Sequence, residues 1–257
     1  MNLKKLLINN LFRRSISKKI RNFIGIRPSL DTIDYNNLNM STSDAFFWRT
    51  DKKYQTIFRL TNILDYFYGK KEDNIKIIFF DKKNNFIKEL NISNSNLSSE
   101  ILIDHKFLNN TKDYGVFYVF HEINEKINTI IRNSCYTGYI WNNNIPSMVH
   151  GNTITAQKNF SSKKIEFGIG GLSFFKKTNY VVQNNYHKKK TEILIVNPTK
   201  YKINFNVNNE NFKLHKGCSK LISISDQNSL IEINSNCYLL RPIIFEQEND
   251  YLDVYHG

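Results

Sequence analysis

The segment from Tyr136 to Asn152 carries the side chains of this sequence that are best suited to binding a polar ligand. It reads YTGYIWNNNIPSMVHGN and combines two Tyr, one Trp, four Asn and one His. Flat aromatic faces stack on sugar rings, and Asn amides both donate and accept hydrogen bonds. We therefore expect a carbohydrate or another polar ligand to contact Tyr136, Tyr139, Trp141, Asn143, His150 and Asn152. The alternative is an ordered loop whose aromatic rings pack against the body of the protein.

The six histidines show no spacing typical of a metal site, and we predict neither a metal nor a cofactor. His121 is followed by Glu122, but the second His of an H-E-x-x-H zinc motif does not occur. Side chains from different strands can still meet in a folded protein. The alternative function is therefore an enzyme of carbohydrate or cell-envelope metabolism with a site between two lobes. Its candidate residues are His121, Glu122, Arg59 and Arg241, together with His150.

Arginine is scarce in this chain, so each arginine within an apolar run is informative. Arg59 and Arg241 both lie in such runs, and a buried guanidinium there must pair with an acid or with a ligand anion. We expect a structural ion pair for each. Asp44–Arg49 (DAFFWR) is a second dense aromatic patch, which we expect to be core with Arg49 or Asp44 exposed.

Several classes of site are disfavoured by the motifs. The chain has no P-loop, no dinucleotide-binding glycine pattern and no G-x-S-x-G elbow, and the glycines at 168–171 lack the following helix that phosphate binding requires. Cys135, Cys218 and Cys237 are widely separated, which is typical of buried small hydrophobic residues in a reducing compartment.

The elements that must position these residues are short β-strands. Fourteen β-rich runs follow one another between residues 56 and 245, separated by turn-forming Asn, Pro and Gly clusters. In one of them Ile203, Phe205 and Val207 alternate with polar residues, as a strand with one buried face requires. Such spacing favours antiparallel sheets. We predict a mainly β fold made of two antiparallel β-sandwich lobes that are jelly-roll-like.

A weak internal repeat indicates how the strands are grouped. Lys76-Ile77-x-Phe79 and Lys202-Ile203-x-Phe205 are each followed by a second Phe, ten residues after the Lys. This similarity has two explanations: an internal duplication, or a chance match in a chain that is rich in Asn, Lys and Ile. The expected domains are a helix at 1–28, lobe 1 at 29–123, a connecting segment with a short helix and the aromatic/Asn loop at 124–160, and lobe 2 at 161–257.

The positive charge is concentrated at the N-terminus. The chain has a formal net charge of +13, yet eight of its 36 basic residues and none of its 23 acids lie in residues 1–27, so the rest carries an excess of only five. Nucleic acid is therefore an unlikely partner. Ile8, Phe12, Ile16, Ile20 and Ile24 recur every four residues, which predicts a basic amphipathic helix.

Three interpretations of residues 3–24 remain open: a helix lying on an anionic membrane surface, a cleaved targeting presequence, and a helix docked on this chain or a partner. The leading hypothesis adopts the membrane-surface interpretation of this helix. It states that the chain is a non-catalytic β-sandwich protein that binds a polar ligand such as a carbohydrate and is cytoplasmic, peripheral to a membrane.

Overall fold

The computed structural model describes Ile16, Ser17, Ile20 and residues 39–69, 74–93, 98–122, 130–132, 135–173, 177–183, 190–224, 230–237 and 240–256. The fold is mainly β with several antiparallel sheets, as the sequence predicts. Apart from Ile16, Ser17 and Ile20, which are helical, the expected N-terminal helix lies outside the described residues. Among the described residues, no helix has the length and hydrophobicity needed to cross a membrane.

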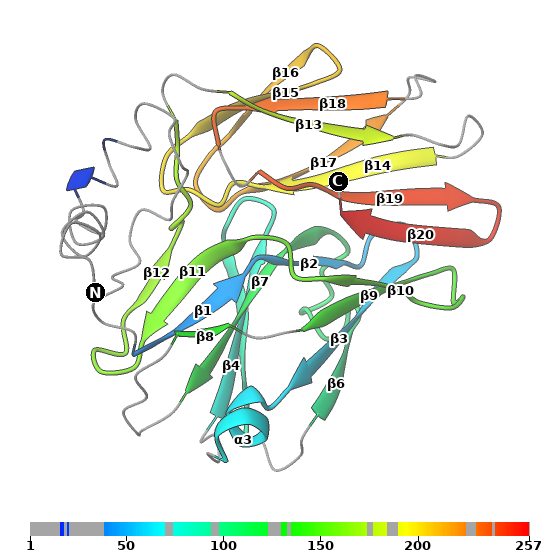
Figure 1. Cartoon of the computed structure of the whole chain (residues 1–257). Coiled ribbons are helices and arrows are strands. Elements are labelled where there is room, and N and C mark those ends of the chain that lie inside the picture. The colour runs from blue at the N-terminus through cyan, green and yellow to red at the C-terminus, as the bar shows by residue number, and fades with distance from the viewer. Residues whose placement is uncertain are drawn as a thin grey trace.

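Three four-stranded sheets form the lower body in Figure 1, which we call the N-lobe. Sheet 1 has the order β12 (Ile165–Phe167), β11 (Ile154–Asn159), β1 (Met40–Asp44) and β8 (Ile130–Arg132). Sheet 2 has the order β2 (Phe46–Arg49), β7 (Tyr114–Glu122), β4 (Asn74–Asp81) and β5 (Phe86–Ile92). Sheet 3 has the order β10 (Ser147–His150), β9 (Tyr136–Trp141), β3 (Tyr54–Thr61) and β6 (Ser98–Ile103).

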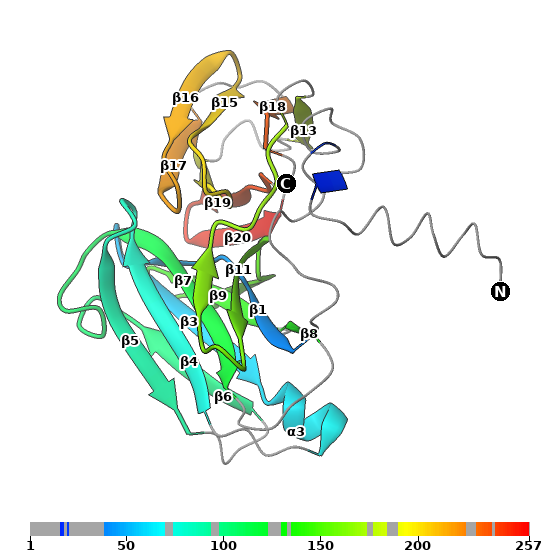
Figure 2. The ribbon, with the colours of Figure 1, turned by 90° about the vertical axis from the view of Figure 1, so that its left-hand side faces the viewer.

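Two further sheets form the upper body, the C-lobe (Figures 1 and 2). Sheet 4 has the order β13 (Thr178–Gln183), β18 (Leu230–Ser235), β15 (Ile203–Val207) and β16 (Glu210–Leu214). Sheet 5 has the order β17 (Ser219–Ile224), β14 (Lys190–Val196), β19 (Ile243–Glu248) and β20 (Tyr251–His256). Paired strands in these sheets are antiparallel, and only β1 and β8 are parallel among the described pairs.

Each lobe has its own hydrophobic core. In the N-lobe, rings from sheet 2 such as Phe79 and Phe117 pack with Phe58 and Leu60 of sheet 3. In the C-lobe, sheets 4 and 5 share a core to which β14 contributes alternate residues that include Ile193. Because side chains alternate across a strand, each core takes one face of its sheets.

A third cluster joins the two lobes. Leu194 and Val196 of β14 point away from the C-lobe core and pack, with Phe245 of β19, against N-lobe residues such as Phe47 and Tyr118. The central strand of sheet 5 is therefore buried on both faces, which explains its uninterrupted run of Ile193-Leu194-Ile195-Val196.

One ion-pair network lies inside this interface. The Arg49 guanidinium is fully buried, donates from Nε and Nη2 to the Asp51 carboxylate at 2.9 and 2.8 Å, and places Nη1 2.8 Å from Oε2 of Glu192 on β14. Its Cζ lies 3.9 Å from the Tyr54 ring centroid and 4.7 Å from that of Phe245. The expectation that Arg49 or Asp44 is exposed is wrong, because both are buried and paired, Asp44 with Arg132.

Strand β1 lacks the alternation of apolar and polar residues by which the sequence indicates a β-strand. β1 reads MSTSD and is buried although polar. β2 pairs with β7 only as far as Phe117. Farther along β7, the backbone amide of Val119 donates to Ser43 Oγ and that of His121 donates to Ser41 Oγ. Hydroxyls thus replace a neighbouring strand, which hydrophobic alternation cannot reveal.

The segment expected to connect the lobes contributes strands to the N-lobe. β9 pairs with β3, and β11 pairs with β1. Of the short helix expected at 122–131, residues 123–129 lie outside the described residues; its two ends are strand instead, because Glu122 ends β7 and Ile130 and Ile131 belong to β8. A helix that the sequence analysis did not predict, α3 (Ile63–Tyr68), follows β3 and is capped by Asn62, whose Oδ1 accepts the Asp65 amide at 3.0 Å.

We predict that Glu192→Gln lowers the free energy of unfolding by about 3 kcal/mol, because it leaves the buried Arg49 with one carboxylate instead of two. Urea denaturation of the whole chain measures this change. The matched control is Glu210→Gln, which alters an exposed glutamate on β16 and should change stability little. Equal effects of the two substitutions would contradict an energetic role for the network.

The ionisation of Glu192 should also make the stability of the protein depend on pH in the acid range. Burial raises the pKa of Glu192, but Arg49 and Lys52 outweigh burial and hold this pKa below its ordinary value. The associated stability is present above the unfolded pKa of about 4.3 and is lost as the pH falls through the folded value. The difference in unfolding free energy between the native chain and Glu192→Gln should therefore shrink below about pH 4.

Candidate functional site

A groove opens where the two lobes meet along β10 and β20. The strands lie side by side (Figure 1), and the Val254 amide of β20 donates to Ser147 Oγ of β10 at 2.9 Å. The groove has a volume of about 790 Å³, which is within the range of small-molecule sites. Its lining consists of Asn144, Ile145, Pro146, Ser147, Met148, Glu248, Asn249, Asp250, Tyr251 and Leu252.

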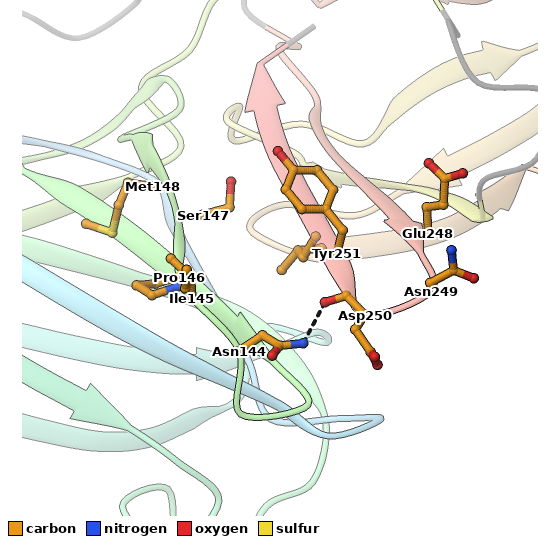
Figure 3. Close-up of a pocket in the computed structure, with 10 residues that line it drawn as sticks. Asn144, Ile145, Pro146, Ser147, Met148, Glu248, Asn249, Asp250 and Tyr251 are labelled. Atoms are coloured by element: carbon orange, nitrogen blue, oxygen red, sulfur yellow. Dashed lines mark hydrogen bonds between the residues drawn. The ribbon is translucent and has the colours of Figure 1, made fainter.

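The two walls of the groove come from different lobes. Residues of the β9–β10 loop form one wall and the β19–β20 turn forms the other (Figure 3). Two amides tie the walls together: Asn144 Nδ2 donates to the Asp250 carbonyl at 2.6 Å, and Asn142 Nδ2 donates to Asp250 Oδ1 at 3.3 Å. The groove therefore exists only when the lobes are docked.

The lining combines hydrogen-bonding groups with apolar surfaces. Asn144 and Asn249 supply amides, and Glu248 and Asp250 supply carboxylates. Pro146, Met148 and the largely exposed Ile145 and Tyr251 supply apolar area. No Lys, Arg or His belongs to this lining. Such a surface suits a neutral ligand that has both hydroxyl groups and apolar faces, as sugar rings have.

Part of the asparagine run serves the backbone. Asn142 and Asn143 both have positive φ angles, 55° and 61°, and the Asn144 amide donates to the Trp141 carbonyl at 3.1 Å. Asn tolerates this left-handed conformation better than most residues. The turn conformation therefore accounts for Asn142 and Asn143, and this turn places Asn144 at the groove.

None of the six expected ligand contacts lines this groove. Tyr139 is buried in the core, where its hydroxyl donates to the Phe47 carbonyl at 3.1 Å. Trp141 is half-buried against the cluster between the lobes, and Asn143 is exposed in the turn. None of the three lines the groove, whereas their chain neighbours from Asn144 to Met148 do.

A second set of expected residues meets at the other end of the same seam. Tyr136 pairs with Arg59 on β3 and with His150 on β10, so the three share one face of sheet 3. The rings of Tyr136 and His150 lie 4.3 Å apart. Asn152 Nδ2 donates to the Arg241 carbonyl at 2.6 Å. Residues that the sequence analysis assigned to two sites are thus neighbours.

His256 belongs to this second set, although the sequence analysis did not select it. Burial lowers the pKa of His256 to about 4 and the charge of Arg241 acts in the same direction, whereas hydrogen bonding to the backbone of His150 and Pro242 raises this pKa by less. We call Tyr136, His150, Asn152, Arg241 and His256 the cationic corner. No sequence signal singles out His256, because its position depends on how β20 meets β10.

Arg59 itself is neutralised by an acid. Its Nε lies 2.6 Å from Glu100 Oε2, and both side chains are more than half exposed. The ion pair expected for Arg59 is present, but on the surface. The ion pair expected for Arg241 is wrong for the described residues: Arg241 is exposed, so it needs no buried partner, and no described acid pairs with it.

His121 and Glu122 lie elsewhere, at the end of β7. His121 is fully buried, and the Glu122 carboxylate pairs with Lys158 of β11 and lies 3.9 Å from Lys76 Nζ. In the part of the chain that the structure describes, no ion pair or hydrogen bond connects this network to His150 or Arg241. Nor do the described residues include a cluster of His, Cys, Asp and Glu that could hold a metal ion.

Comparisons with known proteins do not assign the chain to a family. No protein-family model matches it, and no curated protein matches it significantly.

We predict that the His256 ring titrates near pH 4 in an NMR titration of the full chain, because it is buried beside Arg241. Its folded pKa lies below the unfolded value of about 6.5, so stability should decline as the pH falls from about 6.5 towards 4. Removing the neighbouring charge with Arg241→Gln should raise the titration midpoint. A ring that titrates above pH 6 in the native chain would contradict this packing.

Proposed function

We propose that the protein is a non-catalytic binding protein that holds a polar ligand such as a carbohydrate in the groove between β10 and β20. The observation that supports this proposal most directly is the lining itself, which places amides and carboxylates beside exposed Ile145 and Tyr251. Sugars present hydroxyl groups at the ring edge and C–H groups on the ring faces, so both kinds of surface would be used.

The proposal extends to the architecture. We interpret sheets 2 and 3 of the N-lobe as one eight-stranded β-sandwich, sheets 4 and 5 of the C-lobe as another, and the two sandwiches as an internal duplication. The order β2-β7-β4-β5 matches β13-β18-β15-β16, and the order β10-β9-β3-β6 matches β20-β19-β14-β17. Corresponding strands also follow one another in the same sequence along the chain, and the similar segments that begin at Lys76 and Lys202 fall on the corresponding strands β4 and β15.

This correspondence gives the groove a simple origin. Its walls come from the hairpins β9–β10 and β19–β20, which occupy equivalent places in the two halves. The strands β1, β8, β11 and β12 form sheet 1 and have no counterpart among the described strands of the C-lobe. The ligand would therefore lie on the line where two related sandwiches meet, a common place for small-molecule sites.

The alternative function is an enzyme of carbohydrate or cell-envelope metabolism. The observation that favours it is the proximity of two imidazoles, those of His150 and His256, at the same seam as the groove. Such a pair could serve as an acid and a base. It would leave His121 and Glu122 outside the site.

We also propose that residues 3–24 hold the protein on an anionic membrane surface, near the cytoplasmic face. The supporting observation is that Ile16 and Ile20, one helical turn apart in the sequence, are 70% and 54% exposed. More than half of each side chain is therefore open to solvent. Each nearby Lys or Arg would add about 1 kcal/mol of attraction to acidic lipid headgroups.

Glycan binding is tested with the full chain on a glycan array, followed by calorimetry with the best ligand. Tyr251→Ala should weaken binding about fivefold to tenfold, because it removes an aromatic face from the groove. The matched control is Tyr201→Ala, an exposed tyrosine on the C-lobe that does not line the groove. If the array shows no ligand, or if the two variants bind alike, the groove assignment fails. A bound glycan that is recovered cleaved or modified would favour the enzyme.

Membrane binding is tested by sedimentation with vesicles of phosphatidylglycerol, with phosphatidylcholine vesicles as the neutral reference. We expect the full chain to sediment with the acidic vesicles and a chain that starts at Ser29 to remain in solution. The double substitution Ile16→Ser and Ile20→Ser keeps every charge and should also weaken sedimentation, because the apolar stripe is lost. Equal binding by the shortened chain would refute the membrane role of residues 3–24.

A further inference from the structure

Arg241 differs from the other arginines that the structure describes. Each of the others is held by carboxylates: Arg49 by Asp51 and Glu192, Arg59 by Glu100, and Arg132 by Asp44. Arg241 is exposed, and no ion pair joins it to a described residue. Its guanidinium is thus available to an anion from solution, and its planar fork suits a carboxylate or a phosphate.

Among the described residues, no carboxylate faces Arg241 on this side of the seam without a partner of its own. The His256 imidazole is close enough to Arg241 to be affected by its charge, and His256 in turn lies next to His150. Asp44 is close to Gly151, where an added Cβ would lie 2.7 Å from Asp44 Oδ2, but Arg132 already binds this carboxylate through two nitrogens. Along β20, Asp253 alternates with Val254, which faces the other lobe, so Asp253 lies on the opposite face of sheet 5.

A buried acceptor at the same corner lacks a hydrogen-bond donor. Asn152 is 4% exposed, and its Oδ1 has no hydrogen-bond partner although its Nδ2 is used. An unsatisfied buried acceptor is costly, so a donor supplied by a ligand would be favoured. A ligand with a hydroxyl group next to an anionic group would supply a donor to Asn152 Oδ1 and an anion to Arg241. The exposed ring of Tyr136, which contacts His150, adds a surface on which a sugar ring can lie.

The corner is close enough to the groove for one ligand to reach both. Ser147 and Met148 line the groove, and His150 follows within the same strand. Two or three residues of a strand correspond to roughly 7 to 10 Å, about the length of two sugar units. The walls of the groove carry no cation, so the two ends of the seam differ in the ligand charge that they favour.

We propose that the cationic corner binds the carboxylate or phosphate group of an acidic oligosaccharide whose uncharged part occupies the groove. This inference rests on the proposed function of the groove for the identity of the ligand, but the anion-binding corner itself can be tested alone. Arg241 would bind the oxyanion, and Asn152 Oδ1 would accept a hydroxyl group of the sugar.

The first test uses inorganic phosphate as the probe and the full chain as the protein. Phosphate should produce a saturable shift of the His150 and His256 ring signals in NMR spectra. Arg241→Gln should abolish the shift, and Lys213→Gln, which removes an exposed charge from β16, should leave it unchanged. No saturable shift, or a shift that survives Arg241→Gln, overturns the anion site.

The second test uses a matched pair of tetramers, three glucose units ending in a single glucuronate and the same tetramer after reduction of its one carboxyl group to an alcohol. We expect the acidic tetramer to bind about tenfold more tightly, and Arg241→Gln to remove this preference while leaving the neutral tetramer unaffected. High salt should also reduce the preference. Equal binding of both tetramers by the native chain overturns the acidic ligand class.

The two tests separate the failure of this inference from failure of the proposed function. A phosphate shift that depends on Arg241, in a protein that binds no glycan, would leave the anion site standing and refute the groove. Glycan binding that depends on Tyr251, without a phosphate shift, would leave the groove standing and refute the anion site.

Discussion

The buried Arg49 guanidinium is the constraint on which the arrangement of the lobes depends. It leaves water entirely and is compensated by Asp51 from its own lobe and by Glu192 from the other. A buried charge without its partner is strongly destabilising, whereas hydrophobic contacts tolerate small shifts. The apolar cluster between the lobes therefore supplies attraction, and the ion pair, enclosed by the rings of Tyr54 and Phe245, fixes one relative position.

That position creates the seam between β10 and β20. The groove at one end is closed by bonds from Asn142 and Asn144 to Asp250, and the cationic corner at the other end is assembled from β9, β10, β20 and the segments beside them. Neither end is complete within one lobe. Any ligand held at the seam would therefore also stabilise the docked arrangement of the lobes.

The sequence analysis selected a segment that borders the proposed groove, but not the residues that line it. The aromatic and Asn-rich segment does border the groove and the corner, because turn residues and the ends of its strands meet at the seam. Tyr139 was nevertheless assigned to the ligand and lies in the core, since residue type does not reveal which face of a strand is buried. The proximity of Tyr136, His150 and Arg241 depends on pairing between distant strands, which spacing along the chain cannot show.

The sequence by itself determined the β class, most strand positions and the concentration of positive charge near the N-terminus, because alternation, turn residues and charge are local properties. The tertiary structure decided which strands were missed, as with polar β1, whose serine hydroxyls accept amides of β7. It also decided the burial of Arg49, the separation of His121 from His150, and the joining of Arg241 to His256. Each of these results from contacts between residues far apart in the chain, whose energies depend on burial and geometry that no local pattern records.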